Sequence, residues 1–290
     1  MSVSASELES SYRGWLDCLN GKRWDELQKY LDSKYDHGGQ EFTPEGFVAH
    51  IQSVSAAIGL STVHVDTTLI DEENQCVADI LYASLNPTVP FLGPEPTGRE
   101  LTLREFRFIW FKNGKWSKAT MAINSDDLRK QMTDSNYHHD LDLVSGWPVP
   151  TANRLSKEEL EATYRGYIDT IVSRRGETDL AKYVHSEVTF NKNVLALDAY
   201  REMIGGFQTA IPDLDVQVDA LVAQEETQRI AVRLLVSGTP AIEWDGLAAG
   251  RAVVFPEYAI YQIVDGKIQR VFSISDLDSA KQQQQQQQQQ

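Results

Sequence analysis

Apolar residues recur at helical spacing near the start of the chain and again past its midpoint. In both places they form one face of a predicted amphipathic helix, preceded by a Ser-x-x-Glu capping box that satisfies free N–H groups at a helix start. The capping boxes are Ser4-x-x-Glu7 and Ser156-x-x-Glu159. The apolar faces are Leu8, Tyr12, Trp15, Leu16 and Leu19 in the first segment and Leu160, Tyr164, Tyr167, Ile168 and Ile171 in the second.

The two segments are copies of one sequence. Eight of the 17 positions in 4–20 are identical to those in 156–172, and the offset between Gly14 and Gly166 is 152 residues. The same offset separates Gly114 from Gly266, near the end of each copy. An offset that is kept over this distance predicts two copies of one domain.

After the helical segments the period of the pattern changes to two residues, which is typical of strands. The predicted helices are 4–20, 24–31 and 44–54 in the first copy and 156–172, 178–184 and 197–207 in the second. The main late strands are 103–111 and 116–123, then 253–263 and 268–274, and each pair is joined by Asn-Gly or Asp-Gly, a strong hairpin signal. Each copy therefore has the pattern of an α+β domain, with about three helices packed on a curved antiparallel sheet.

The remaining segments set the domain limits. Residues 134–154 are polar, then proline-bearing, and match nothing in the repeat, so they are predicted to be a linker. The predicted domains are 1–133 and 155–281. Nine consecutive glutamines occupy 282–290 and offer no apolar face, which predicts a disordered tail.

Composition narrows the class of partner. The net charge of −15 argues against nucleic acid and against an anionic membrane surface. Two cysteines, Cys18 and Cys76, cannot form a disulfide framework and are predicted to be buried thiols. The start of the chain lacks a signal-peptide pattern, so a cytoplasmic protein is expected.

Short motifs in the second copy follow an order that resembles the SnoaL-like polyketide cyclase family, part of the NTF2-like superfamily. They are Ala210-Ile-Pro-Asp-Leu-Asp215, Gly238-Thr-Pro240, Gly250-Arg251, Glu257, Asp265-Gly-Lys-Ile268 and Ser275-Asp276. The first copy is similar but eroded, with Pro96-Thr-Gly-Arg99, Glu105, Asn113-Gly-Lys115 and Asn124. The resemblance implies two tandem cone domains, each with a deep pocket at its wide end.

The resemblance also implies a type of chemistry. Members of this family act without a cofactor on polycyclic natural products, as aldol cyclases or as isomerases of meroterpenoids, and the related scytalone dehydratases eliminate water. In the cyclases a carboxylate on the last strand moves protons. The superfamily also contains non-catalytic binders, so the fold does not decide the function.

Asp276 is the first candidate for the general base or acid. It lies ten residues after Gly266, where the resemblance implies the last-strand carboxylate, and an apolar pocket would raise its pKa. The alternative is a helix or turn cap, because Ser275-Asp276-Leu277-Asp278 has the composition of one. Its counterpart in the first copy is Asn124, which cannot act as a base.

Glu257 and Glu105 occupy matching positions on strands with apolar neighbours. A carboxylate there is costly unless it is paired or functional, so Glu257 is a second catalytic candidate and Glu105 a substrate-binding one. A structural hydrogen bond or a solvent-facing position is the alternative for both. Tyr261 shares the face of Glu257 at period two, and with Tyr164 it is expected first in the core and secondarily in the pocket wall.

Asn191 and His37 follow the second predicted helix of their copies, in the aligned pairs Phe190-Asn191 and His37-Gly38. The family often has His-Asn here, and each copy keeps one member. Asn191 is therefore a catalytic candidate. His37 is a possible acid–base or substrate-binding group near neutral pH, or a histidine hydrogen-bonded to local backbone.

Arg233 is the remaining substrate-binding candidate. It alternates with Val232 and Leu234, so it would polarise a substrate carbonyl or pair with Glu257 if its face lines the pocket, and would be solvated otherwise. The run His138-His139-Asp140 lacks a positioned third ligand, so no metal site is expected. No cofactor motif is present in the sequence either.

The sequence therefore predicts an isomerase or cyclase that acts on an apolar, oxygenated small molecule in the second copy. Dehydration, hydrolysis of an epoxide or lactone, and non-catalytic binding remain open. The first copy is expected to be mainly a structural partner. Because an internal repeat can replace a dimer interface, either a monomer or a homodimer is expected.

Overall fold

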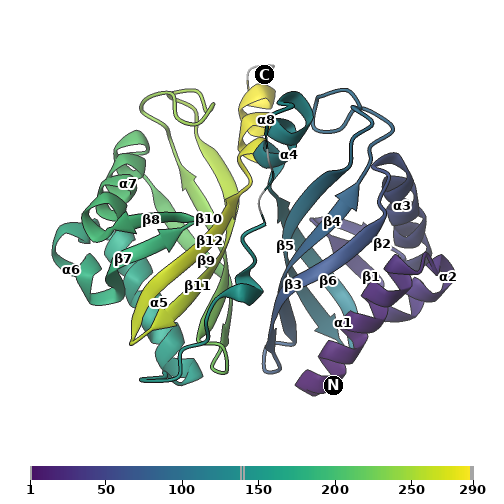
Figure 1. The fold of residues 1–290 in the computed structure, drawn as a ribbon, viewed down its shortest axis with the longest axis horizontal. Coiled ribbons are helices and arrows are strands. Elements are labelled where there is room, and N and C mark those ends of the chain that lie inside the picture. Colours follow the sequence, from purple (N-terminus) through teal and green to yellow (C-terminus); the bar gives the residue numbers. More distant parts are fainter. Residues whose placement is uncertain (1, 138, 140, 288–290) are drawn as a thin grey trace. The chain divides into compact units, whose positions relative to one another are not determined.

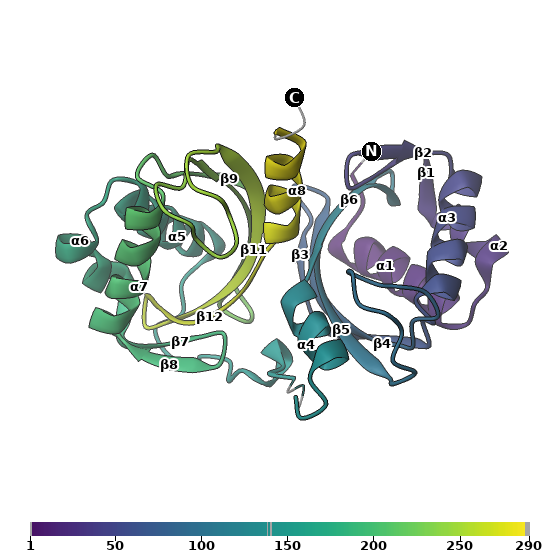
Figure 2. The same cartoon turned by 90° about the horizontal axis from the view of Figure 1, so that it is seen from above.

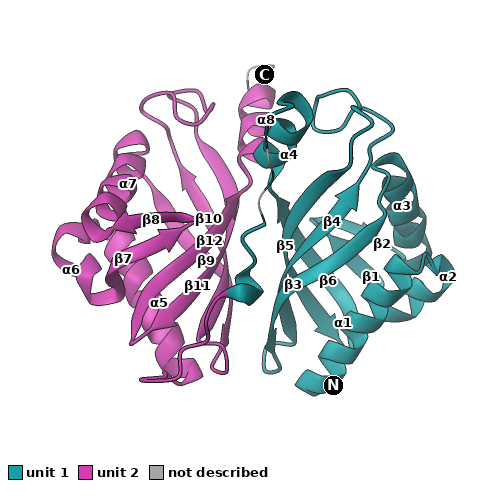
Figure 3. Ribbon diagram, in the orientation of Figure 1, with its two compact units in different colours: residues 1–146 teal, residues 147–290 magenta. Residues whose placement is uncertain are grey.

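The chain folds into two compact units of matching architecture, residues 1–146 and 147–290 (Figure 3). The computed structural model describes residues 2–137, 139 and 141–287 of the 290-residue chain. The division falls inside the predicted linker 134–154. Among the described residues no helix has the length and apolar character needed to cross a membrane.

Each unit has helices on the concave side of a curved sheet (Figures 1 and 2). The first unit contains α1 (Ala5–Asn20), α2 (Trp24–Leu27), a 3-10 turn (Gln28–Tyr30), β1 (Leu31–His37), β2 (Gln40–Phe42), α3 (Pro44–Ala57), β3 (Thr62–Asp71), β4 (Cys76–Leu85), β5 (Leu101–Lys112), β6 (Lys115–Ile123), α4 (Ser125–Thr133) and a 3-10 turn (Val144–Gly146). The second contains α5 (Lys157–Val172), α6 (Gly176–Tyr183), β7 (Val184–Phe190), β8 (Asn193–Ala196), α7 (Leu197–Ala210), β9 (Asp215–Gln224), β10 (Arg229–Gly238), β11 (Val253–Val264), β12 (Lys267–Ser275) and α8 (Leu277–Gln287).

The two sheets have the same six-stranded topology, with orders β2-β1-β6-β5-β4-β3 and β8-β7-β12-β11-β10-β9. The long strands pair antiparallel, but β1 runs parallel to β6 and β7 parallel to β12. The prediction of two tandem α+β domains is confirmed. The parallel pairing and the fourth α-helix of each unit were not predicted, because short elements carry little periodicity.

Local sequence signals account for the ends of the elements. Both predicted capping boxes form, at Ser4 and at Ser156. The predicted hairpin turns adopt positive φ at Asn113 and Gly114 (52° and 74°) and at Asp265 and Gly266 (47° and 75°). These angles match the type I′ turn that suits the twist of paired strands.

The Tyr-Arg-Gly triplet shared by the copies has a packing reason. A Cβ on Gly14 would lie 2.4 Å from the Tyr30 hydroxyl, and a Cβ on Gly166 would lie 2.5 Å from the ring of Tyr183. Each first helix therefore needs a glycine where an aromatic side chain packs against its backbone.

Gly166→Ala is expected to destabilise the second unit by about 1–3 kcal/mol, because the added methyl group overlaps the Tyr183 ring. Urea unfolding of the two proteins measures the difference. Gly205→Ala in α7 is the matched control, since its Cβ would meet nothing within 4 Å. Alanine is the better helix former, so that variant should be neutral or more stable. Equal losses in both variants would contradict the packing argument.

The glutamine tract was predicted to be disordered, but its described part, residues 282–287, continues helix α8. The side chain of Gln284 is buried, accepts the N–H of Ala248 at 2.7 Å and donates to the Ala248 carbonyl at 3.1 Å. Gln283 makes the same two-way contact with the backbone of Val254. Amide side chains can satisfy loop backbone, and buried Ala280 anchors the helix. Residues 288–290 lie outside the described part.

The predicted linker is held against the units on either side of its midpoint. In the first unit, Asp66 accepts the N–H groups of Val144 and Ser145, each at 2.9 Å. In the second, Arg229 donates to the carbonyl of Trp147 at 3.0 Å. Both cysteines are buried, as predicted.

Candidate functional site

The second unit contains a cavity of about 510 Å³ between its concave sheet face and its helices. Strand alternation supplies the floor: Phe255, Glu257 and Tyr261 of β11 point inward, as do Ser273 and Ser275 of β12. The rest of the lining is mostly apolar and comes from other strands, from α5 and α7 and from the loop after β10. The helices and the loop contribute Ile168, Ile171, Met203, Ile204, Phe207, Ile242 and Trp244. This is the wall expected for an apolar ligand with few polar groups.

Among the residues that the structure describes, Glu257 is the one carboxylate that lines this cavity. Burial raises its pKa to about 7, and a hydrogen bond from the Ser273 side chain holds back that rise. A carboxyl that is half-ionised near neutral pH can both accept and donate a proton. Of the predicted candidates, Glu257 therefore has the surroundings of an acid–base group.

Three tyrosines of the cavity wall bring hydroxyl groups into the same space. The hydroxyls of Tyr167 and Tyr200 are 2.6 Å apart, and Tyr261 lies on the strand face of Glu257. Burial raises the pKa of Tyr167 and of Tyr261 well above the usual value, so these hydroxyls stay protonated. Tyr164 is fully buried behind them, with its ring centre 4.9 Å from that of Tyr261, and does not line the cavity.

Asn191 holds β12 in place rather than lining the cavity. Its side chain accepts the N–H of Ser273 at 2.8 Å and donates to the Ser273 carbonyl at 3.2 Å. Because Ser273 bonds to Glu257, Asn191 is a positioning residue for the carboxyl. The sequence prediction chose the right neighbourhood but assigned Asn191 a more direct part than the structure supports.

The structure does not bring Asp276 into the cavity. Ser273 and Ser275 of β12 line the cavity, but Asp276, which follows the end of that strand, does not. Its carboxylate accepts the N–H of Ser279 at 3.1 Å in the first turn of α8. Asn124 accepts from Asp127 at the start of α4 in the same way, at 3.4 Å. The contacts of both residues are those of helix caps, the alternative left open by the sequence.

Arg233 also lies on the other face of its strand. Leu234 and Val236 line the cavity, whereas Arg233 pairs with Asp219 and donates to the Tyr258 hydroxyl at 3.0 Å. The expected contact with Glu257 is therefore absent from the described structure. Arg233 has no direct access to a ligand in the cavity.

The first unit encloses a smaller cavity of about 220 Å³ with a different polar set. Glu105, the counterpart of Glu257, lines it together with His37, Tyr35 and Arg107. Burial raises the pKa of Glu105 to about 7, while Arg107 opposes and Asp79 supports the rise. The site is altered in kind rather than eroded, because polar groups lost from β6 are replaced by polar groups on β1 and β5.

His37 is uncharged at neutral pH. Burial lowers its pKa to about 4, helped by the nearby His50 and Arg107. Its Nδ1 is 3.2 Å from the Tyr35 hydroxyl, and its ring packs 4.8 Å from that of Phe47. The side chain lines the cavity of the first unit, and its lowered pKa does not favour the acid–base role near neutral pH that the sequence left open.

Sequence reasoning missed Arg107 and Ser273, both of which line a cavity. The signal was available, since Arg107 follows Glu105 at period two on β5 and Ser273 precedes Ser275 at period two on β12. Extending the inward face of β5 from Glu105 would have found Arg107, and extending that of β12 from Ser275 would have found Ser273.

The described residues contain no group of three or more His, Cys, Asp or Glu side chains arranged to hold a metal ion. In the histidine run of the linker, His139 Nδ1 lies 2.7 Å from Asp127, which fits a local ion pair or hydrogen bond. Its neighbours at 138 and 140 lie outside the described residues.

The raised pKa of Glu257 predicts a pH-dependent stability. A folded-state pKa of about 7 lies above the ordinary 4.5, so the folded chain binds this proton more tightly than the unfolded chain. The contribution of Glu257 to stability therefore falls as pH rises from about 4.5 to 7 and then levels off. Urea titrations should therefore show that the free energy of unfolding of Glu257→Gln rises relative to that of the wild type over this pH range. A difference that is constant with pH would mean that the carboxyl is already ionised in the folded chain.

The sequence model of the family described as SnoaL-like polyketide cyclase matches residues 9–132 and 161–284. The chain belongs to the SnoaL-like polyketide cyclase family. The two matched segments fall one in each compact unit, so this SnoaL-like chain carries the family domain twice. The search of curated proteins returns no match.

Solved structures include similar domains. A SnoaL-like polyketide cyclase from Agrobacterium tumefaciens is 30% identical, with a TM-score of 0.41, over 43% of this chain and 97% of that one. IdmH, a putative polyketide cyclase from Streptomyces antibioticus, is 20% identical over 43% and 97% of the two chains, with a TM-score of 0.39. AclR, a putative hydroxylase from Streptomyces galilaeus, is 21% identical over 43% and 93%, with a TM-score of 0.38.

Proposed function

We propose that this SnoaL-like protein isomerises or cyclises an apolar, oxygenated secondary metabolite of polyketide or meroterpenoid type in the cavity of its second unit. The observation that carries the proposal is the surroundings of Glu257: a single carboxyl in a largely apolar cavity, with its pKa raised by burial to about 7. Family membership supports the type of substrate.

In the proposed reaction, Glu257 takes a proton from a carbon next to a substrate carbonyl and returns it at another atom. Negative charge moves onto the carbonyl oxygen in between. The protonated hydroxyls of Tyr167, Tyr200 or Tyr261 are placed to donate a hydrogen bond to that oxygen. Substrate and product then have the same composition, and the carboxyl ends in its starting state.

The mass of the product tests the reaction class. Extracts of a host that makes the pathway intermediates are compared by mass spectrometry with the wild-type protein, with Glu257→Gln and without the protein. A new product of unchanged mass that needs Glu257 is the expected result. Loss of water would indicate a dehydratase, and gain of water a hydrolase of an epoxide or lactone. If every extract gives the same products, the protein is a binding module.

A further inference from the structure

One member of a buried ion pair, Arg107, lines the cavity of the first unit, and the second unit has no counterpart of that pair among its described residues. Arg107 on β5 faces Asp79 on β4 across the sheet and bonds to it through two nitrogens, Nε at 3.0 Å and Nη2. Tyr12 donates its hydroxyl to the same carboxylate. At the same register in the second unit, Val232 faces Ala259. The pair is therefore an addition to the domain plan, not a requirement of the fold.

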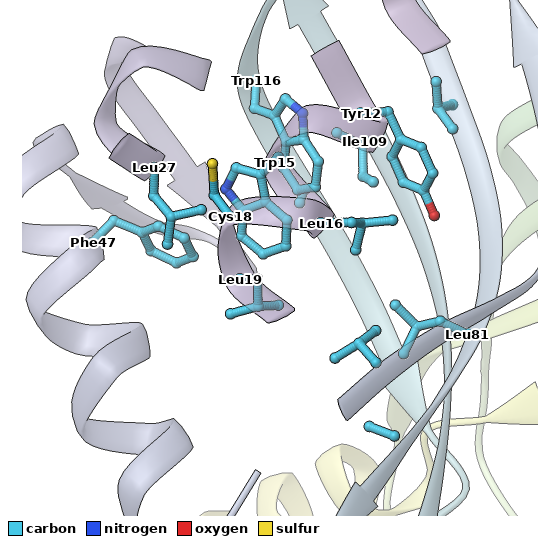
Figure 4. Packing of buried hydrophobic residues seen from close by; sticks show 14 of the residues in the cluster. Tyr12, Trp15, Leu16, Cys18, Leu19, Leu27, Phe47, Leu81, Ile109 and Trp116 are labelled. Carbon is cyan, nitrogen blue, oxygen red and sulfur yellow. The ribbon is translucent and has the colours of Figure 1, made fainter. Parts of the chain in front are cut away.

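Arg107 is held rigidly with one nitrogen left over. Its side chain is 7% exposed, and its guanidinium carbon lies 5.9 Å from the ring centre of Trp15 and 5.7 Å from that of Trp116. The two indoles, which are labelled in Figure 4, lie next to each other. Their ring centres are 4.4 Å apart in a stacked arrangement. Among the described residues, the hydrogen bonds of Arg107 are made by Nε and Nη2, and Nη1 has no partner. Arg107 lines the cavity. Since Nη1 is not one of the described buried atoms that lack a partner, it is accessible and can donate to water or to a ligand in the cavity.

Glu105 supplies a second donor on the same strand face. It precedes Arg107 by two residues, which places the two side chains about 6.7 Å apart along the strand. Both line the cavity. Because burial raises the pKa of Glu105 to about 7, its carboxyl is about half-protonated at neutral pH and largely protonated below it, and the protonated form can donate. An oxygen atom between the two side chains could accept from both.

The charge of the cavity selects a neutral ligand. Asp79 balances Arg107, His37 is uncharged at neutral pH, and Glu105 is either neutral or negatively charged, so no positive charge is left over for an anion. An anion would enter without a net counter-charge and lose its hydration, which is expensive in an apolar site. A carbonyl oxygen needs only donors, and the cavity provides them.

We propose that the first unit is a second ligand site, which binds a compact neutral ketone or enone with its carbonyl oxygen between Arg107 and Glu105. The volume of about 220 Å³ suits one ring with a short substituent, since an apolar cavity of about 150 Å³ holds benzene. The wall of Trp15, Phe47, Phe91 and Met121 favours a flat apolar body. The site is distinct from the cavity of Glu257 and needs no turnover there.

Titration with acetophenone, cumene and benzoate tests the site, since the three probes share a ring and differ in the group offered to Arg107. Affinity is read from the indole ¹H–¹⁵N signal of Trp15, assigned with Trp15→Phe. The signal of Trp244, which lines the other cavity, reports the second unit separately. Acetophenone is expected to bind at Trp15 at least tenfold more tightly than cumene or benzoate.

The chain provides the matched variant. Asp79→Val with Arg107→Ala installs the pair that the second unit already carries, and should reduce the preference for acetophenone over cumene to about twofold at Trp15 without changing Trp244. Glu105→Gln, which still has a donor, should retain the preference. Glu105→Leu should reduce it severalfold, and this variant tests the site even if the double variant fails to fold.

Equal binding of acetophenone and cumene, tighter binding of benzoate, or a response confined to Trp244 would overturn the proposal. A Glu257→Gln protein should titrate as wild type at Trp15, so the proposed reaction can fail without affecting this result.

Discussion

Glu257→Gln is expected to lower kcat of the proposed reaction by about 10²- to 10⁴-fold, the usual loss when a general acid–base group is removed. Glutamine keeps the size of the side chain and can still accept a hydrogen bond from Ser273. It cannot take up or release a proton. KM should change little, because the wall that binds the apolar body of the substrate is intact. Steady-state kinetics on the substrate identified by product mass measures both constants.

The pH profile separates acid–base catalysis from a role in binding. Since burial raises the pKa of Glu257 to about 7, kcat/KM should show an inflection near that pH in the wild type and lose it in Glu257→Gln. If Glu257→Gln instead raised KM and left the pH dependence of kcat/KM unchanged, the carboxyl would only orient the substrate.

Asp276→Asn is the matched control for that experiment. Asparagine is as good a helix cap as aspartate, so α8 should be retained. The side chain of Asp276 does not line the cavity, and it accepts the N–H of Ser279 in the first turn of α8. Turnover within about twofold of wild type is expected. If Asp276→Asn abolished turnover while Glu257→Gln retained it, the roles of the two carboxylates would be reversed.

The predictability of these sites from sequence depended on strand alternation. Period two correctly placed Glu257 and Tyr261 on one face, because side-chain direction is a local property of a strand. Whether that face is concave depends on how the whole sheet curves, which no single strand encodes. Arg233 was left open for this reason, and its face proved to be the one away from the cavity.

Other features depended on partners that are distant in the sequence. The pairing of Asp79 with Arg107 joins residues 28 apart, and the tie between Asn191 and Ser273 joins residues 82 apart. The glutamine tract illustrates the same limit, because its side chains bond to backbone that is distant in the sequence, as in the contact of Gln284 with Ala248, 36 residues away. Composition alone described the glutamines as solvated, while the fold provides amide partners for them.

Arg107→Ala is expected to destabilise the first unit by about 3–5 kcal/mol, because it leaves the carboxylate of Asp79 buried without its counter-ion. Asp79 is 1% exposed, and Tyr12 alone would remain to satisfy it. A loss of this size is a large part of the roughly 5–15 kcal/mol that stabilises a typical domain. Four of the six tryptophans, Trp15, Trp24, Trp110 and Trp116, lie in the first unit, so fluorescence-detected urea unfolding reports mainly on it.

Asp79→Val, which removes the other member of the pair, should destabilise the first unit less than Arg107→Ala does. Asp79→Val leaves Arg107 charged, but Glu105 lies two residues away on the same face and can ionise to pair with it. The double variant removes both charges and restores the apolar pair found in the second unit, so it should be more stable than Arg107→Ala by about 2 kcal/mol. Strict additivity of the two single losses would contradict a buried pair whose members depend on each other.

The ion pair of Arg233 with Asp219 in the second unit is more exposed to solvent than that of Arg107 with Asp79, so it tests whether burial causes the large loss. There the side chains are 15% and 33% exposed, and water can solvate whichever charge is left. Arg233→Met should therefore cost only about 0.5–1 kcal/mol. If its loss equalled that of Arg107→Ala, burial would not be the cause of the larger effect. A small loss at Arg233 beside a large one at Arg107 would show that the first unit tolerates a costly charge pair at its cavity wall, which is the expected signature of a group kept for a ligand.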